Sequence, residues 1–271
     1  MLKSTSDVNP NEQGIFALFK GESGAGKSVA ALSFPTPYVI DADRKMPNVA
    51  FKHFPGKEIA YETFDNIFDL SDKMNVLSAS CPYETIVVDS GTSLAALCLS
   101  SIATIKGEET PKLLKMLKPT KTGVLQIELM SIDYYNGETR FFYYFLDWLK
   151  SMWARPGNPK NVILIVHVIT TESAPDLKTK MVTRTRRIIT AGRAIAAYIP
   201  SQFDDVFLFG QQREGGMAMN DPDVKTKRIM RTTPIGEDDA RTTLKLPDFI
   251  DFTNTNLYDK MRKHMKGDMT V

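Results

Sequence analysis

The sequence has little of what several classes of protein require. Only two cysteines and three histidines occur among 271 residues, with no spacing typical of metal ligands, so we expect no zinc site. Cys81 and Cys98 stand in apolar surroundings and no signal-peptide pattern precedes them, which predicts reduced core thiols in a cytoplasmic protein. The longest apolar run, Val162 to Val166, is far too short to span a membrane and suits a buried strand.

Net charge is also small. The chain carries 34 Lys and Arg against 32 Asp and Glu, a formal net charge of +2. This balance provides no general attraction to nucleic acid, so any such binding must depend on a local basic cluster. With 42% hydrophobic and 24% charged residues, the chain can bury a substantial core and is predicted to fold mainly as one large domain.

The most informative motif is the segment 21–28, which reads GESGAGKS and follows the apolar run 15–19. It fits the phosphate-loop pattern G-x-x-x-x-G-K-[ST], in which glycines let the backbone wrap around phosphates and the next helix adds its positive N-terminus. Lys27 is predicted to bridge the β- and γ-phosphates, and Ser28 to hold Mg²⁺. A glycine-rich turn without a ligand is the alternative, which the flanking strand and helix disfavour. The predicted nucleotide-binding residues are Gly21, Glu22, Ser23, Gly24, Ala25, Gly26, Lys27, Ser28 and Val29.

Strand-like apolar runs alternate along the chain with segments of helical periodicity. The runs 38–40, 86–88, 162–166 and 206–208 are nearly continuous in apolar residues, which is typical of strands buried on both faces. The pattern predicts an α/β fold with a mainly parallel sheet covered by helices on both faces. We divide the chain into a polar N-terminal tail or docking arm (1–13), a core (14–250) and a small C-terminal helical extension (251–271).

Acidic residues follow two of these runs. Asp89 ends the run 85–89, after the phosphate loop, and is predicted to hold Mg²⁺ together with Ser28. Asp43 closes the run 38–43 and is the candidate for polarising the water that attacks the γ-phosphate, whereas a structural role is open for Asp41. The alternative is that Asp41 and Asp43 merely terminate a strand. Because Asp is one methylene shorter than Glu, we expect slow turnover.

A histidine and a basic cluster follow the run 162–166. His167 is predicted either to sense the γ-phosphate or to be a satisfied strand-end histidine, and both interpretations stay open. The basic residues of this cluster alternate with threonines. Such charged and hydroxyl groups on a mobile loop suit contact with a phosphate backbone, and a merely solvated loop is the alternative. The predicted DNA contacts are Lys178, Lys180, Arg184, Arg186, Arg187 and Arg193.

Two earlier segments are further candidates for contact with nucleic acid. The stretch 106–121 is rich in lysine and is the second candidate for the main DNA contact. The stretch 141–153 is rich in aromatic residues at helical spacing, which favours core packing over stacking on bases.

Four segments in this order, GESGAGKS, YVIDAD, TIVVDS and VILIVH, resemble those of the RecA-like recombinase ATPases. The likeness is to small phage-encoded RecA-like proteins associated with single-strand annealing and recombination, and it implies a RecA-like P-loop NTPase core. It implies that Asp43 stands in the place of the catalytic glutamate, that His167 senses the γ-phosphate, and that 168–192 is a DNA-binding loop. The segment 239–247 is similar to one whose two basic residues reach a neighbour's ATP site; Arg241 keeps the first, and Thr243 replaces the second.

The resemblance implies a function as well as a fold. It implies ATP and Mg²⁺ as cofactors, single-stranded DNA as partner, self-association into a filament or ring, and contact with a single-strand DNA-binding protein, all in the cytoplasm of a phage-infected bacterial cell. The predicted protein is a slow, DNA-stimulated ATPase that promotes strand annealing or recombination, with hydrolysis at subunit interfaces. One alternative is an ATP-gated DNA-binding scaffold with negligible turnover, which Asp43 and Thr243 favour. The other is a P-loop kinase or packaging ATPase.

Overall fold

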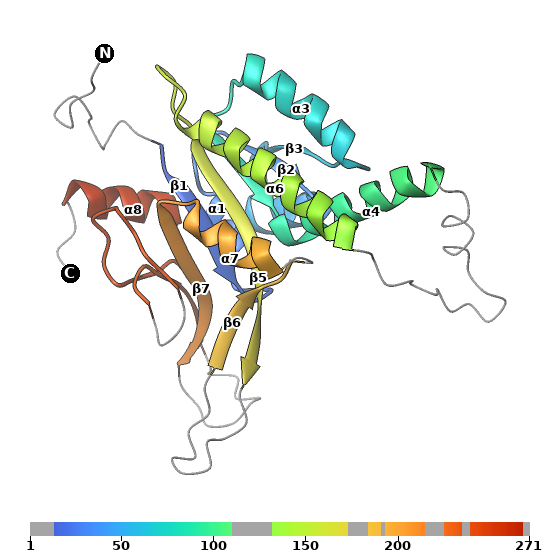
Figure 1. Cartoon of the computed structure of the whole chain (residues 1–271). Coiled ribbons are helices and arrows are strands. Elements are labelled where there is room, and N and C mark those ends of the chain that lie inside the picture. The colour runs from blue at the N-terminus through green and yellow to red at the C-terminus, as the bar shows by residue number, and fades with distance from the viewer. Residues whose placement is uncertain are drawn as a thin grey trace, which may run out of the picture.

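The computed structural model describes residues 14–109, 132–172, 184–190, 193–214, 225–234 and 239–267. A nine-stranded sheet forms the centre of this part of the chain, in the order β3-β2-β4-β5-β1-β7-β8-β9, with β6 paired to β5 (Figure 1). The strands are β1 (Phe16–Gly21), β2 (Pro37–Asp41), β3 (Ala60–Glu62), β4 (Thr85–Asp89), β5 (Asn161–Glu172), β6 (Arg184–Ile188), β7 (Asp205–Glu214), β8 (Lys225–Arg231) and β9 (Phe249–Asp251).

Six of these strands run parallel, from β3 across to β7, and the β7–β8 and β8–β9 pairs are antiparallel. The helices between them are α1 (Lys27–Ala31), α2 (Met46–His53), α3 (Ile67–Ala79), α4 (Gly91–Glu109), α6 (Ile132–Trp153), α7 (Arg193–Ser201) and α8 (Leu257–Lys266). The predicted α/β fold with a mainly parallel sheet flanked by helices is therefore confirmed.

The two faces of the sheet bury separate cores because side chains alternate along each strand. In β1, Phe16 and Leu18 join a cluster that includes residues of α3, α4, α6 and α7. Ala17 and Phe19 join a second cluster on the other face, built with α1, Met46 of α2 and Leu257 and Met261 of α8. Helices thus cover both faces, and α8, which lies in the predicted C-terminal helical extension, packs directly onto the second core.

The aromatic segment lies in α6 and packs mainly into the first cluster. Phe142 and Phe145 are fully buried and Trp148 nearly so, while Tyr144 faces outward and is 56% exposed. The prediction that this segment contributes to the core is confirmed for its buried members. Within the described ranges, no helix is both long and apolar enough to cross a membrane.

Two strands extend beyond their predicted ends. β5 continues through His167 to Glu172, because residues 168–172 pair antiparallel with β6 after the pairing with β1 has ended at Gly21 and His167. β7 likewise continues to Glu214 by pairing with β8. The predicted basic loop after His167 was therefore wrong in its described part, which is an antiparallel ribbon. Figure 1 shows this ribbon and the end of β7 projecting from the same edge of the sheet.

Candidate nucleotide-binding site

The phosphate loop joins β1 to α1 at the carboxyl edge of the parallel sheet. All six residues of β1 are buried, so the loop begins from a rigid position. Gly24 and Gly26 adopt φ values of 80° and 91°, a region that favours glycine. A Cβ atom on Gly26 would lie 3.0 Å from Cδ of Arg228, so the close approach of β8 also favours glycine here. The glycines of the motif are thus required by this loop conformation.

Lys27 begins α1, and its ammonium group turns back into the loop. Nζ donates hydrogen bonds to the carbonyl oxygens of Gly21 at 2.7 Å and Glu22 at 2.8 Å. Burial of the side chain lowers the pKa of Lys27 to about 8, although the negative charge of Asp89 acts in the opposite direction. A phosphate in the loop would favour the charged form and replace the carbonyl oxygens as acceptor.

Asp89 ends β4 with a fully buried carboxylate. Neither oxygen has a hydrogen-bond partner among the described residues. Burial raises the pKa of Asp89, and the Ser28 hydroxyl opposes this effect from a position outside hydrogen-bonding geometry. A buried carboxylate without partners is costly, so a positive ligand at this position would be strongly stabilised.

The carboxylate of Asp89 and the hydroxyl of Ser28 fit a bound Mg²⁺. Hard cations prefer such oxygen ligands, and Mg²⁺ commonly takes one or two from the protein and the rest from phosphates and water. In the described part of the chain, no group of three or more His, Cys, Asp and Glu side chains is arranged to hold a metal ion. Ser28 and Asp89 supply two oxygen ligands, so they would hold Mg²⁺ together with the nucleotide, whose phosphate charge the cation would offset.

Asp43 lies in the turn after β2 and is surrounded by donors. Its Oδ1 accepts hydrogen bonds from the hydroxyls of Ser90, at 2.8 Å, and of Ser93. Its Oδ2 pairs with the ammonium of Lys45 and lies 3.5 Å from Nε2 of His167. Burial acts to raise the pKa of Asp43, but the hydrogen bonds from His167, Lys45 and the serines outweigh it and hold the pKa far below its usual range. The carboxylate therefore stays ionised.

Asp41 has a structural role. Its carboxylate accepts hydrogen bonds from the backbone amides of Lys45 at 3.2 Å and Met46 at 2.8 Å, at the start of α2. A carboxylate here satisfies amides that have no partner within the helix and complements the helix dipole. The structural interpretation left open for Asp41 is thus confirmed, and it also explains how the turn bearing Asp43 and Lys45 is positioned.

His167 lies between the phosphate loop and Asp43. Its Nδ1 is 3.4 Å from Nζ of Lys27, while Nε2 faces Asp43. The backbone amide of His167 donates to the Thr92 hydroxyl at 3.0 Å, and its carbonyl oxygen accepts from the Ile189 amide at 2.9 Å. The side chain contacts two candidate catalytic residues, and the backbone leads directly into the β5–β6 ribbon.

Two adjoining cavities lie beside α1. The first, of about 320 Å³, is bounded by the phosphate loop, Lys45, Lys52, His167 and Arg228. The second, of about 280 Å³, shares Val29, His53 and Arg228 with the first and ends against Phe252, Leu257 and the polar segment 253–256. The first is rich in cations and the second mixes apolar and amide groups, as a nucleotide's phosphates and nucleoside require.

Sequence reasoning missed three cations of the first cavity, namely Lys45, Lys52 and Arg228. Lys45 could have been found, because it follows Asp43 by two residues at the same strand end. Arg228 carries no local signal, because it lies on β8, far along the chain from the loop it adjoins.

Arg241 lies at the end of the strands opposite to the phosphate loop. Its backbone pairs with Val206 near the start of β7. Its guanidinium donates to the carbonyl oxygens of Pro200 at 2.5 Å and Phe203 at 3.1 Å, and pairs with Asp239 at 3.3 Å. The side chain is therefore held by its own chain and is remote from its own phosphate loop. Its role in a neighbour's site stays a prediction.

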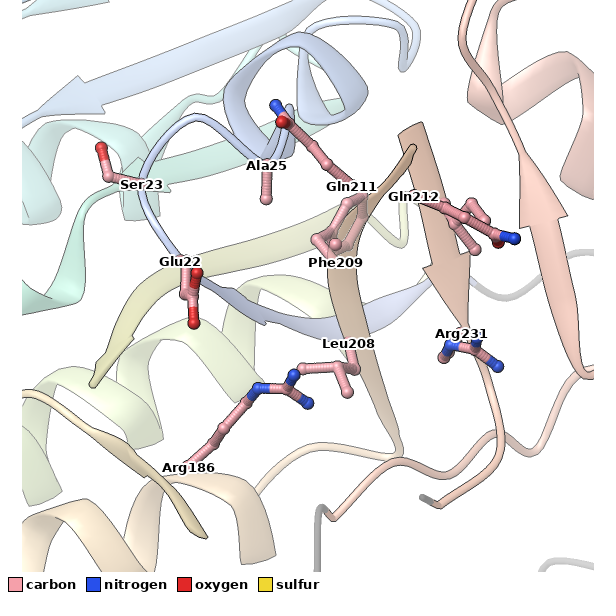
Figure 2. Close-up of a pocket in the computed structure, with 11 residues that line it drawn as sticks. Glu22, Ser23, Ala25, Arg186, Leu208, Phe209, Gln211, Gln212 and Arg231 are labelled. Carbon is pink, nitrogen blue, oxygen red and sulfur yellow. The ribbon is translucent and has the colours of Figure 1, made fainter. Parts of the chain in front are cut away.

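Among the six predicted DNA contacts, the structure describes the side chains of Arg186 and Arg187. Arg186 lines a cavity beside the phosphate loop (Figure 2) and Arg187 is exposed on β6. Arg184 begins β6 and Arg193 begins α7. Lys178, Lys180 and most of the lysine-rich segment 106–121 lie outside the described residues.

Comparison with known proteins supports the nucleotide site. Residues 14–112 match the family model of the AAA domain, a span that holds the phosphate loop, Asp43 and Asp89. No curated protein matches the sequence at a significant level. The match and the geometry agree on an AAA-type, P-loop ATPase-like domain in this chain.

Proposed function

We propose that this protein is an ATPase that binds ATP with Mg²⁺, assembles on single-stranded DNA, and promotes strand annealing or recombination. The observation that carries the nucleotide part is the gathering of Lys27, His167 and Asp89 at the carboxyl ends of the adjacent strands β1, β5 and β4. Phosphoryl transfer depends on such positioned charges at the γ-phosphate.

The two cavities beside α1 support a placement for the nucleotide. The triphosphate would lie in the loop and the cation-lined cavity, and the nucleoside in the adjoining one. There, Arg228 and the amide-bearing segment 253–256 would contact sugar and base, while Phe252 and Leu257 supply apolar surface. Lys45, in the turn before α2, and Lys52, on α2, would both face the phosphates.

Hydrolysis would depend on Asp43 and His167. An ionised Asp43 is a weak proton acceptor but can orient water by accepting a hydrogen bond. Because four side chains already contact its two oxygens, a water would have to share this carboxylate, which supports slow turnover. His167 would couple the γ-phosphate to the ribbon that follows it, and Arg241 would act on the ATP site of a neighbouring subunit in a filament or ring.

The enclosure of Asp43 also favours a second candidate function. If the carboxylate serves mainly to hold Lys45 and His167 in place, ATP would act as a structural ligand in a DNA-binding scaffold with negligible turnover. The two functions share the nucleotide site and differ in whether Asp43 contacts water.

Hydrolysis by the purified full chain, with and without single-stranded DNA, tests the proposal, with electron microscopy of the same samples for filaments or rings. Stimulation by DNA with ordered assemblies is the expected result. Mg²⁺-dependent ATP binding without turnover would select the scaffold, and absence of ATP binding would overturn both. Arg241→Ala mixed with Lys27→Ala should recover part of the activity if sites are shared between subunits; no recovery in demonstrated mixed assemblies would exclude the finger.

A further inference from the structure

A row of side chains along α2 leads from the phosphate end of the nucleotide site toward its nucleoside end. The first of the two cavities beside α1 is lined, from this helix and the residue before it, by Lys45, Val49, Lys52 and His53. Spacings of three and four residues place side chains on one face of a helix. Eight residues of helix rise by about 12 Å, which is comparable with the distance from the γ-phosphate to the sugar of an extended nucleotide. His53, at the far end of the row, is therefore at the height of the sugar.

The sugar of a bound nucleotide would lie where the two cavities meet. Three residues line both cavities, namely Val29, His53 and Arg228. A nucleotide with its phosphates in the first cavity and its base in the second must pass its sugar between these side chains. Val29 offers apolar surface there, and Arg228 offers charged donors. The neutral imidazole of His53 offers one donor and one acceptor, which matches a hydroxyl group that can accept and donate.

Other polar side chains of the second cavity are already engaged with the protein. The Ser33 hydroxyl donates to a carbonyl oxygen of α1 at 2.6 Å. The Thr253 hydroxyl donates to Asp251 at 2.6 Å, and the side-chain oxygen of Asn256 accepts from a backbone amide of α8 at 3.0 Å. Within the described part of the chain, no hydrogen bond holds the ring of His53. This ring is therefore available to a ligand at the junction.

The charge pattern separates His53 from the residues that serve the phosphates. Burial and the positive charges of Arg228 and Lys52 lower the pKa of His53, so the ring is neutral at pH 7 in the nucleotide-free protein. In the first cavity, the ammonium groups of Lys27, Lys45 and Lys52 meet the phosphate charge. A neutral ring at the end of this row adds hydrogen-bonding capacity and no charge, which suits a sugar hydroxyl.

We propose that His53 forms a hydrogen bond with the 2′-hydroxyl of the bound nucleotide and so selects ribonucleotides over deoxyribonucleotides. The inference rests on the proposed function of the nucleotide site and adds the sugar class of its substrate. Asn254 and Thr255, which line the second cavity alone, are then left for the base. A site that hydrogen-bonds a substrate hydroxyl disfavours the analogue without it, because the polar group of the protein then loses its partner.

Titration calorimetry of the full chain with ATP and with 2′-deoxy-ATP, both in the presence of Mg²⁺, tests the inference through a ratio of affinities. Wild type should bind ATP at least about fivefold more tightly than 2′-deoxy-ATP, the effect of one hydrogen bond at a half-exposed site. His53→Phe keeps a flat ring without polar atoms, so its ratio should fall toward one, mainly through weaker binding of ATP. His53→Gln keeps a donor and an acceptor and should retain part of the preference.

Two control variants separate the sugar contact from general effects on the site. Lys52→Gln, in the same turn of α2 but lining only the first cavity, should weaken both nucleotides equally and leave the ratio unchanged. His264→Phe, in the last turn of α8 and lining neither cavity, should leave both affinities unchanged. Because each conclusion depends on a ratio measured within one variant, a partial loss of folded protein does not imitate the expected result.

Three outcomes would overturn the inference. If wild type binds ATP and 2′-deoxy-ATP equally, or discriminates only against 3′-deoxy-ATP, the 2′-hydroxyl has no partner in this site. If His53→Phe keeps the wild-type ratio, whether or not both affinities fall, the ring does not contact that hydroxyl. The proposed function stands in both of these cases. If wild type binds neither nucleotide, the proposed function fails together with the inference.

Discussion

Nε2 of His167 lies 3.5 Å from Oδ2 of Asp43, so the residue where β5 leaves the parallel sheet contacts a carboxylate in the turn after β2. β4 lies between those two strands in the sheet. The other ring nitrogen of His167 faces Lys27 at 3.4 Å. One imidazole thus connects the lysine of the phosphate loop with the carboxylate proposed to orient water.

His167→Ala should reduce ATP hydrolysis by about tenfold or more, because loss of a hydrogen bond to a charged group costs about 1.5–3 kcal/mol. Nucleotide affinity should change much less, since Lys27 keeps its loop contacts. Steady-state hydrolysis and fluorescent nucleotide binding measure the two effects. His264→Ala, in the last turn of α8, is the matched control. Equal hydrolysis in both variants would contradict a role for His167.

Nucleotide affinity should depend on pH through Lys27. The free protein holds this lysine at a pKa of about 8, and bound phosphate raises it, so binding takes up a proton above pH 8. Nucleotide affinity should be highest and constant below pH 8. Above pH 8 it should fall by up to about tenfold per pH unit, until the pKa of the bound form is reached.

Titration calorimetry at about pH 8.5 in two buffers of different ionisation enthalpy measures this proton uptake directly. Lys57→Gln provides the control, because Lys57 also has a pKa lowered by burial but contacts the carbonyl of Leu32 and lines neither nucleotide cavity. The same pH dependence should persist in that variant. Affinity that stays constant from about pH 7.5 to 9.5 would show that Lys27 is already charged in the free loop.

Asp89→Asn should stabilise the nucleotide-free protein at neutral pH. The folded state raises the pKa of Asp89, so its stabilising contribution is complete below the unfolded pKa and is lost as pH rises through the folded pKa. At pH 7, above the unfolded pKa, burial of this carboxyl group opposes folding, and its replacement should raise the free energy of unfolding by about 1–3 kcal/mol. The gain should vanish at pH values below the unfolded pKa.

Asp251→Asn gives the opposite sign in the same assay. The Thr253 hydroxyl and amide donate to Asp251 and hold its pKa below the usual value despite partial burial, so this carboxylate stabilises the fold above its unfolded pKa. Denaturant unfolding at pH 4 and pH 7 compares the two variants. Loss of stability in Asp89→Asn at pH 7 would mean that the carboxylate has a partner. Asp89→Asn should also lose the Mg²⁺-dependent part of nucleotide binding.

Arg228→Gln should weaken nucleotide binding about five- to tenfold, because a charged hydrogen bond to phosphate or sugar is worth roughly 1–2 kcal/mol at a half-exposed site. Cδ of Arg228 lies against Gly26, and the Arg228 side chain lines both cavities beside α1. Competition with a fluorescent nucleotide, at two salt concentrations, measures the effect. Arg262→Gln on α8 controls for net charge. If both variants bind equally well, Arg228 only packs against the loop.

The sequence by itself determined the phosphate loop, the parallel order of alternating strands and helices, and the positions of Lys27, Ser28 and Asp89. These are local properties, because a phosphate loop is contiguous and apolar runs mark buried strands wherever they occur. The predicted C-terminal helical extension, 251–271, contains the helix 257–266, whose ends have local causes: Asn256 caps its start and Gly267 ends it in the left-handed conformation.

Only the tertiary structure decided which polar groups meet. Asp43 contacts Lys45 from its own turn but His167 and Ser93 from other elements, and Arg228 approaches Gly26 through strand pairing across β1, β7 and β8. The segments 168–172 and 184–188 carry no apolar pattern that distinguishes a ribbon from a loop. Each becomes a strand only because the other pairs with it. That the Asp89 carboxylate has no hydrogen-bond partner among the described residues is a property of its whole surroundings, which no stretch of sequence contains.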